Sequence, residues 1–182
     1  MNYNKDLLKS WIDEGIDYEE NDDLTSEEFK ILHLKHCIKI NKRIKYCKEL
    51  LVHYKDPFIY YTLADLYNRY DFDEAGRILY KQDVRFYCIM AIRQDRNYAP
   101  AWVLLAETYW WLAIVVGAEA ISDSPELKDQ DPIFQEGKKR QIGYIEKAIS
   151  YIKKALKIEP VNEEYKDLLE FYYQERNDMY CS

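Results

Sequence analysis

Glycine and proline are scarce in this chain, with five of each among 182 residues. Both residues interrupt helices and favour turns, so their scarcity disfavours a loop-rich all-β fold and favours long helices. The sequence also lacks a glycine-rich phosphate loop, a G-x-S-x-G motif and an H-E-x-x-H motif. Only three histidines are present, all between positions 33 and 53. We therefore predict a helical protein that is not an enzyme and holds no cofactor.

Cysteine pairs with the spacing of zinc or redox sites are also missing. The four cysteines, none of them in a C-x2-C pair, are Cys37, Cys47, Cys88 and Cys181. Because three of them fall inside expected helices, buried free thiols are the simplest interpretation. His33, His36 and Cys37 lie within one helical turn, but a metal there would need two further ligands. We therefore predict no metal site at these residues.

An excess of negative charge limits the partners. The formal net charge of −7 disfavours nucleic acid and anionic membranes. The first ten residues lack the apolar core of a signal peptide. The most apolar window, Thr108–Ala118, is flanked by Glu107 and Glu119 and is shorter than the roughly 20 residues that a membrane-spanning helix needs. We therefore predict a cytoplasmic protein that contacts neither nucleic acid nor a membrane.

In the first third of the chain, negative and positive charges lie in different segments. We predict a short helix over Asn4–Glu14 and a long one over Ser26–Tyr54. Between Asp13 and Glu28 there are nine carboxylates and no base. The long helix has a basic face, made of Lys35, Lys39, Lys42, Arg43, Lys45 and Lys48. Neutralisation of one by the other within the fold is the simplest interpretation, and recruitment of an acidic partner is the alternative.

The acidic segment also permits a calcium hypothesis. Positions 1, 3, 5, 7, 9 and 12 of an EF-hand loop are matched by Asp17, Glu19, Asn21, Asp23, Thr25 and Glu28. However, Asp22 stands where the loop has glycine, and the sequence shows no second loop to pair with. An acidic linker, with Thr25 and Glu28 as the capping box of the next helix, explains the same residues.

Asp-Pro pairs mark two later helix starts, because Asp caps a helix and proline suits its first turn. Asp56-Pro57 opens a helix over Phe58–Arg69, and Asp131-Pro132 opens one that ends at Ile158. Apolar residues continue after Tyr109 to about Ile121, so we predict that residues 110–158 form a long, projecting antiparallel hairpin. The remaining expected elements are a helix from Asp71 or Asp73 to Gln94, a helix over Asn162–Asn177, and a tail over 178–182.

Short motifs at matching positions carry a family resemblance. The spacing W-x2-L-G-x2-Y is followed by Trp102, Leu105, Ala106 and Tyr109. It recurs upstream in Tyr60, Leu63, Ala64 and Tyr67. The spacing A-x3-F-x2-A-x4-P is followed by Ala148, Ile152, Ala155 and Pro160. Over about residues 56–176 the chain resembles the tetratricopeptide repeat (TPR) family of helix-turn-helix units.

The resemblance implies an all-α fold, a right-handed superhelix of antiparallel helix hairpins with about seven helices. Tyr67 and Ala91 are 24 residues apart, where the family usually has about 16, so the hairpins are expected to be elongated. We expect a single domain over 1–182. Its expected parts are N-terminal helices with an acidic linker over 1–55, two repeats with insertions over 56–160, and a capping helix over 161–177.

The resemblance also implies a binding surface, because the first helices of stacked repeats line a concave groove. The groove positions are Phe58, Tyr61, Asp65, Asn68, Arg69, Val103, Glu107, Trp110, Trp111, Asp167, Phe171 and Gln174. Members of the family that clamp a carboxylate tail use Lys, Arg and Asn, where this chain has Tyr61 and Asp65. We therefore expect an apolar or basic partner segment. The alternative is that Trp110 and Trp111 pack against the hairpin or the first two helices.

Three functional hypotheses follow. The leading one is a protein-interaction module, an adaptor or co-chaperone-like scaffold that holds a protein or peptide segment in the groove. The second is a structural subunit that self-associates into a homo-oligomer through the hairpin over 110–158. The third is a calcium-responsive regulator that uses the acidic segment Asp17–Glu28.

Overall fold

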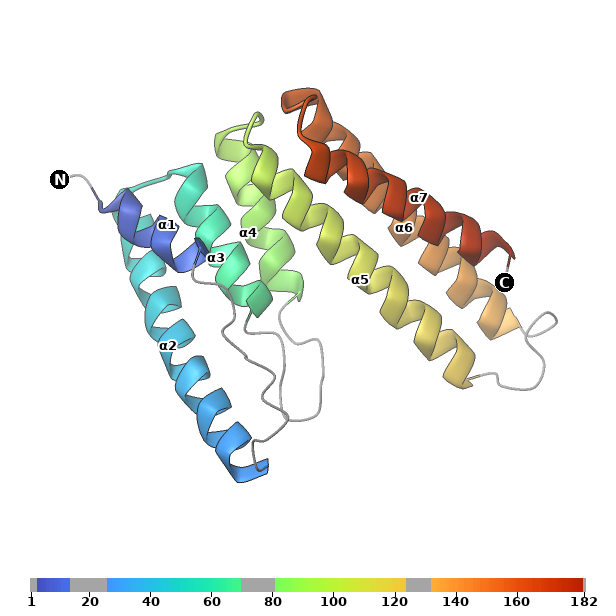
Figure 1. The fold of residues 1–182 in the computed structure, drawn as a ribbon, viewed down its shortest axis with the longest axis horizontal. Coiled ribbons are helices and arrows are strands. Elements are labelled where there is room, and N and C mark those ends of the chain that lie inside the picture. The colour runs from blue at the N-terminus through green and yellow to red at the C-terminus, as the bar shows by residue number, and fades with distance from the viewer. Residues whose placement is uncertain (1–2, 14–25, 70–80, 124–131, 182) are drawn as a thin grey trace. The chain divides into compact units, whose positions relative to one another are not determined.

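The computed structural model describes residues 3–13, 26–69, 81–123 and 132–181. These residues form seven α-helices and no strand (Figure 1), which confirms the all-α prediction. The chain divides into two compact units, Met1–Asp95 and Arg96–Ser182, which are called unit 1 and unit 2 below. The single domain expected from the sequence stays a prediction.

Unit 1 contains four helices: α1 over Lys5–Asp13, α2 over Ser26–His53, α3 over Pro57–Arg69 and α4 over Lys81–Gln94. Side-chain caps stabilise the N-terminal ends of two of these helices. The Asn4 Oδ1 accepts a hydrogen bond from the Leu7 backbone N–H at 3.0 Å, and the Asp56 Oδ1 accepts one from Phe58 at 2.8 Å. Helices need such acceptors because their first N–H groups have no partner within the helix. The bounds predicted for these helices are confirmed to within one or two residues, except the start of α4, because residues 70–80 are outside the described part.

α3 lies at the centre of unit 1 and contacts α1, α2 and α4. Its residues Ile59, Leu63 and Leu66 recur at steps of three and four, which places them on one face, and all three are at most 1 % exposed. The neighbouring helices cover α3 with buried side chains, among them Leu8, Ile40, Cys47, Val84, Cys88 and Ala91. Cys47 and Cys88 are thus buried thiols, as predicted, whereas the prediction is wrong for Cys37, which is only half-buried on α2.

Unit 2 contains α5 over Ala99–Asp123, α6 over Pro132–Ile158 and α7 over Glu163–Cys181 (Figure 1). α5 and α6 contact each other, and α7 packs on α6. Buried residues recur every seven positions on each helix: Ala99, Ala106 and Ala113 on α5, Ile145 and Ile152 on α6, and Tyr165, Tyr172 and Met179 on α7. Seven residues make about two helical turns, so each series forms one stripe. The alanine stripe lets the α6 backbone approach α5 closely, and the predicted burial of Ala106 is confirmed at 0 % exposure.

The predicted hairpin is helical along both described arms, and its bounds agree with α5 and α6. The predicted tail is wrong, because α7 continues to Cys181, four residues beyond the expected end at Asn177. The physical reason is Met179, which continues the buried stripe of α7 and is 7 % exposed in the core. α7 therefore covers part of the hairpin.

One described segment, Ala99–Ala118 in α5, is long and apolar enough to cross a membrane by length and composition. The sequence argument that this region is too short is therefore wrong, because the single charge of Glu107 does not end the apolar stretch. Half of the apolar window is buried inside the protein, and the core helix of a water-soluble protein passes the same test. The segment is consequently weak evidence for a membrane span.

Candidate protein-binding site

The predicted groove residues fall in both units. α3 of unit 1 carries Tyr61, Asp65, Asn68 and Arg69, whereas unit 2 carries Val103, Glu107, Trp110 and Trp111 on α5 and Phe171 on α7. Within unit 1 the structure brings Asp65 and Arg69 together. Within unit 2 it brings Trp110, Trp111 and Phe171 together. The other groove positions are Phe58 on α3 and Asp167 and Gln174 on α7, and a partner-binding role stays a prediction for all twelve residues.

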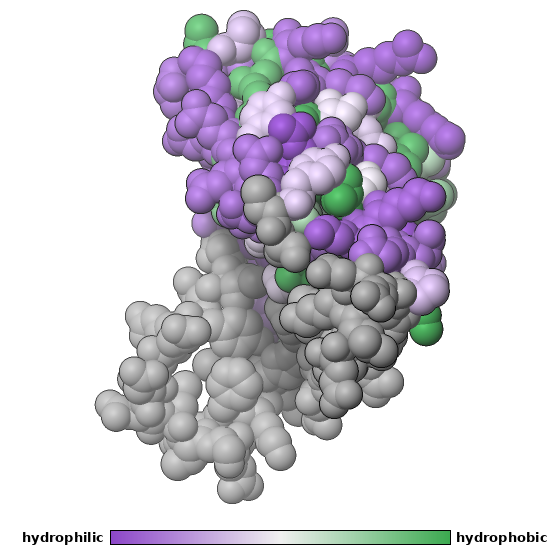
Figure 2. Space-filling model, turned by 90° about the vertical axis from the view of Figure 1, so that its right-hand side faces the viewer, coloured by the Kyte–Doolittle hydropathy of each residue, from purple (hydrophilic) through white to green (hydrophobic). Residues whose placement is uncertain are grey.

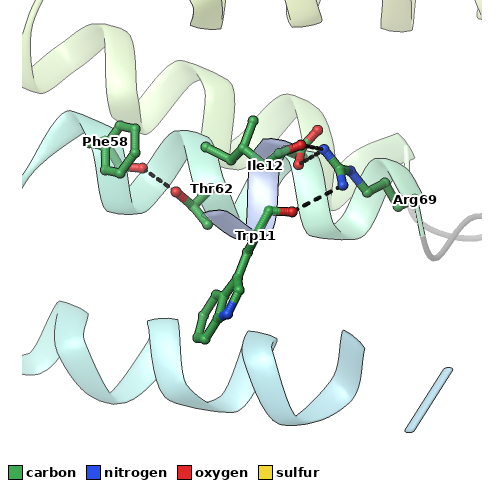
Figure 3. A network of polar contacts seen from close by, with 6 residues as sticks. Trp11, Ile12, Phe58, Thr62 and Arg69 are labelled. Carbon is green, nitrogen blue, oxygen red and sulfur yellow. Dashed lines mark hydrogen bonds and ion pairs between the residues drawn. The ribbon is translucent and has the colours of Figure 1, made fainter. Parts of the chain in front are cut away.

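Arg69 and Asp65 connect α3 to the end of α1 (Figure 3). The Arg69 guanidinium lies 2.9 Å from the Asp65 carboxylate and donates hydrogen bonds to the carbonyls of Trp11, at 3.1 Å, and Ile12. These carbonyls belong to the last turn of α1, where no partner within the helix remains and a cation is favoured. Each of the two charged side chains is only 13 % exposed. In this arrangement the pair holds α1 against α3.

Burial raises the pKa of Asp65 to about 6, although the Arg69 charge and hydrogen bond act to lower it. A carboxylate away from water loses hydration, and this favours its neutral form. The ion pair with Arg69 is therefore complete only above mildly acidic pH. The other three predicted residues of α3, which are Phe58, Tyr61 and Asn68, are half-buried.

Four rings of unit 2 form what we call the aromatic cluster: Trp110, Trp111, Phe171 and Tyr172. The Trp110 ring is central. Its centroid lies 5.8 Å from that of Trp111 and 5.5 Å from that of Phe171, both edge-on, and 6.5 Å from that of Tyr172, which is stacked. Such offsets are the favoured geometries of aromatic pairs. The cluster thus joins α5 to α7.

The aromatic cluster has a buried base and an exposed rim. Tyr172 is 1 % exposed, whereas Trp111 is 37 % and Phe171 41 % exposed. Trp110 is half-buried between them, and its Nε1 donates a hydrogen bond to the Glu175 carboxylate at 3.4 Å. Trp110 therefore packs against α7, and its role in a partner-binding groove stays a prediction.

Two carboxylates, Glu107 and Glu175, act on rings of the aromatic cluster. Glu175 bonds to Trp110, and the Glu107 charge adds to burial in raising the pKa of Tyr172. Burial also raises the pKa of Tyr165 to about 12, with Glu159, Glu164 and Glu107 adding to the effect. Exposed carboxylates elsewhere on α7 are Glu163, Glu164, Asp167, Glu170 and Asp178. The remaining predicted residue, Val103, packs against the core of unit 2.

Sequence reasoning missed Tyr172 and Glu175. The seven-residue series Tyr165, Tyr172, Met179 was the available signal for the first. For the second, Glu175 lies four residues after Phe171, on the same helical face.

No group of three or more His, Cys, Asp and Glu side chains that could hold a metal occurs among the residues that the structure describes. The predicted calcium segment Asp17–Glu28 lies outside them up to residue 25, and the side chains of 26–34, including His33, are also outside. The calcium hypothesis therefore stays a prediction.

Comparison with protein-family models, curated proteins and solved structures gives no match. The evidence for a function therefore comes from the contacts, burial and charges of the described residues.

Proposed function

We propose that this protein is a protein-interaction module, and that the aromatic cluster of unit 2 binds an apolar and basic segment of a partner protein. The observation that carries the proposal is the exposed rim of two large rings, Trp111 and Phe171, on a buried aromatic base. Rings of this kind supply much of the binding energy in protein interfaces, where aromatic residues are enriched and carry most hot spots.

The base of the cluster supports binding because it fixes the rim in advance. Trp110 is held by the stack on Tyr172 and by its hydrogen bond to Glu175. A side chain that is already ordered loses less conformational freedom when a partner arrives. Phe171 contacts both Trp110 and Tyr172, at 5.5 and 5.8 Å between ring centroids, and is ordered in the same way.

The surrounding charge selects the partner. Glu107, Glu175 and the exposed carboxylates of α7 favour Lys and Arg next to the apolar contact. Opposite charge at the rim of an interface steers association and disfavours acidic competitors. An amphipathic basic segment meets both requirements.

The TPR resemblance extends this proposal to a superhelix. Tyr61 and Asn68 of α3 are the partner-binding residues that the resemblance implies in unit 1. Asp65 and Arg69 contribute less, because their charges are occupied at the end of α1. An adaptor or scaffold role follows from this reading and is part of the proposal.

Peptide selection tests the proposed site. The full chain is immobilised and offered a displayed library of random peptides, and we expect the selected peptides to be rich in aromatic or aliphatic residues and in Lys and Arg. The variant Trp111→Ala/Phe171→Ala should bind them at least about 30-fold more weakly, since one aromatic hot spot is worth about 2 kcal/mol. Phe86→Ala is the matched control, because Phe86 is a 55 % exposed ring on α4 of unit 1. Equal binding by the double variant and wild type would refute the site.

A further inference from the structure

The outer surface of α6 is strongly basic. Its exposed cations, called the basic face below, are Lys139, Arg140, Lys147, Lys153, Lys154 and Lys157. The exposed carboxylates on the described part of this helix are Glu136 and Glu146, and Glu146 lies 3.2 Å from Arg176 of α7. Along the middle of the face lie Gly143 and Ser150, both exposed, and a Cβ at Gly143 would meet nothing within 4 Å. Small side chains therefore lie between the cations, and they leave room for another helix to approach the basic face.

Aromatic rings hold several of these cations in place. The Lys154 Nζ lies 4.5 Å from the centre of a Trp102 ring and 4.9 Å from that of Tyr151. The Lys147 Nζ lies 5.2 Å from the centre of the Tyr109 ring. These are cation–π distances, which position an ammonium group while part of it stays in water. Lys147 and Lys154 are consequently a fixed pair of charges seven residues apart, about 10.5 Å along the helix axis.

α7 carries the opposite charge on its outer surface. The exposed carboxylates Glu163, Asp167 and Glu170 follow one another at steps of four and three residues, opposite the buried stripe of Tyr165 and Tyr172; we call these three the acidic row. Glu163 and Glu170 are seven residues apart, the same spacing as Lys147 and Lys154. Lys166 is a cation beside the acidic row, and its Nζ lies 2.7 Å from the Glu163 carboxylate. Hydrophilic side chains also dominate the described residues on the face of the molecule in Figure 2, where hydrophobic ones are scattered.

We infer that the protein self-associates head to tail, with the basic face of α6 in one copy docked on the acidic row of α7 in a second copy. The charges are opposite, and their seven-residue spacings match whether the two helices run parallel or antiparallel. Charges flanking a helix pair set partner choice in the same way in coiled coils. The acidic row belongs to the exposed carboxylates of α7 that also border the aromatic cluster, but Trp111 belongs to neither surface, so the Trp111→Ala/Phe171→Ala variant tests the cluster and the lysine variants below test the self-association.

The two surfaces are different parts of the same unit, so the contact is heterologous. A pair of copies then keeps one unoccupied basic face and one unoccupied acidic row, and the assembly grows as an open chain unless it closes into a ring. Exposed ion pairs are individually weak and are screened by salt. The association should therefore be reversible, rise with protein concentration and disappear at high salt.

Sedimentation equilibrium of the full chain at low salt tests this inference. We expect the mean mass of wild type to rise with concentration and to return to that of a monomer in about 1 M salt, where the Debye length is about 3 Å. The variants Lys147→Glu/Lys154→Glu and Asp167→Asn/Glu170→Gln should each be monomeric alone. An equimolar mixture of the two should form a 1:1 dimer, since the mixture contains one intact basic face and one intact acidic row. A wild-type monomer at all concentrations, or a mixture that stays monomeric, would overturn the proposal.

Two further variants separate the contact from other effects. Lys35→Glu/Lys45→Glu makes the same charge change on exposed lysines of α2 and should keep the association. Lys139→Glu/Lys157→Glu alters the basic face away from the cation–π contacts at Lys147 and Lys154, and should abolish association with an unchanged melting temperature. If the Lys35→Glu/Lys45→Glu variant loses the association as the Lys139→Glu/Lys157→Glu variant does, net charge rather than the basic face is responsible and the inference fails. If the Lys139→Glu/Lys157→Glu variant keeps the association, the inference fails as well. A wild-type chain that stays monomeric but binds duplex DNA or phosphatidylserine vesicles would overturn the second copy as the occupant.

Discussion

Replacement of Asp65 by Asn should remove a pH dependence from the stability of the protein. Because the folded pKa of Asp65 lies above its ordinary value of 3.8, the native state holds this proton more tightly than the unfolded chain does. The stability contributed by the protonated carboxyl is present below pH 4 and is lost as the pH rises through about 6. Wild type should therefore lose stability through this group between about pH 4 and pH 6, and Asp65→Asn should not.

The size of the effect follows from the pKa. A change from 3.8 to about 6 is about two pKa units, and each unit corresponds to about 1.4 kcal/mol. The side chain is only 13 % exposed, so screening by water reduces the value little. The difference between wild type and Asp65→Asn should consequently change by about 3 kcal/mol across this pH range. Its absolute sign at neutral pH depends on Arg69, which loses its carboxylate partner in the variant but keeps two carbonyls.

Urea unfolding followed by circular dichroism at several pH values between 4 and 7 measures this difference. Because the chain has 33 Asp and Glu side chains, only the difference between variants reports on Asp65 alone. Asp6→Asn, at an exposed position of α1, is the control and should parallel wild type. If the free energies of unfolding of Asp65→Asn and wild type differ by the same amount from pH 4 to pH 7, burial does not raise the pKa of the Asp65 carboxyl and the explanation is refuted.

Four other predictions concern stability. Ala106→Leu should lower the free energy of unfolding by about 1–3 kcal/mol through overpacking, while Ala118→Leu, at an exposed position of the same helix, should change it little; similar melting temperatures would contradict the close α5–α6 contact. Tyr172→Phe should leave the melting temperature unchanged or raise it, because its buried hydroxyl has no hydrogen-bond partner among the described residues, whereas Tyr165→Phe loses a hydrogen bond to a glutamate worth about 1 kcal/mol. Met179→Ala should cost about 2–5 kcal/mol in chemical unfolding, and a negligible cost would mean that α7 frays before this residue. Millimolar calcium should not raise the melting temperature, and a rise would favour the EF-hand hypothesis.

Local signals in the sequence predicted the helices well. The Asp56-Pro57 pair fixed the start of α3, because both the cap and the proline act within the first turn. The end of α7 was missed because Met179 was placed in the tail, although it continues the seven-residue series of Tyr165 and Tyr172 and is buried.

The contacts of the site depended on partners distant in sequence. Asp65 and Arg69 are four residues apart, so their pairing could be expected from helix geometry alone. Their role could not, because the carbonyls that Arg69 binds are 57 and 58 residues away at the end of α1. Likewise, Trp110 bonds to Glu175, 65 residues later, and only the packing of α7 brings them together.

The stripes of unit 2 also restrict how the hairpin can change length. A single residue inserted in α6 between Ile145 and Ile152 would rotate everything on one side of it by about 100°, turning lysines such as Lys147 or Lys154 toward the core. Seven residues added to each arm would restore the stripes after two turns and leave both the alanine contacts and the lysine–ring contacts in phase. The hairpin can therefore vary in length among descendants of this sequence by whole heptads in both arms together, and single insertions are confined to its ends.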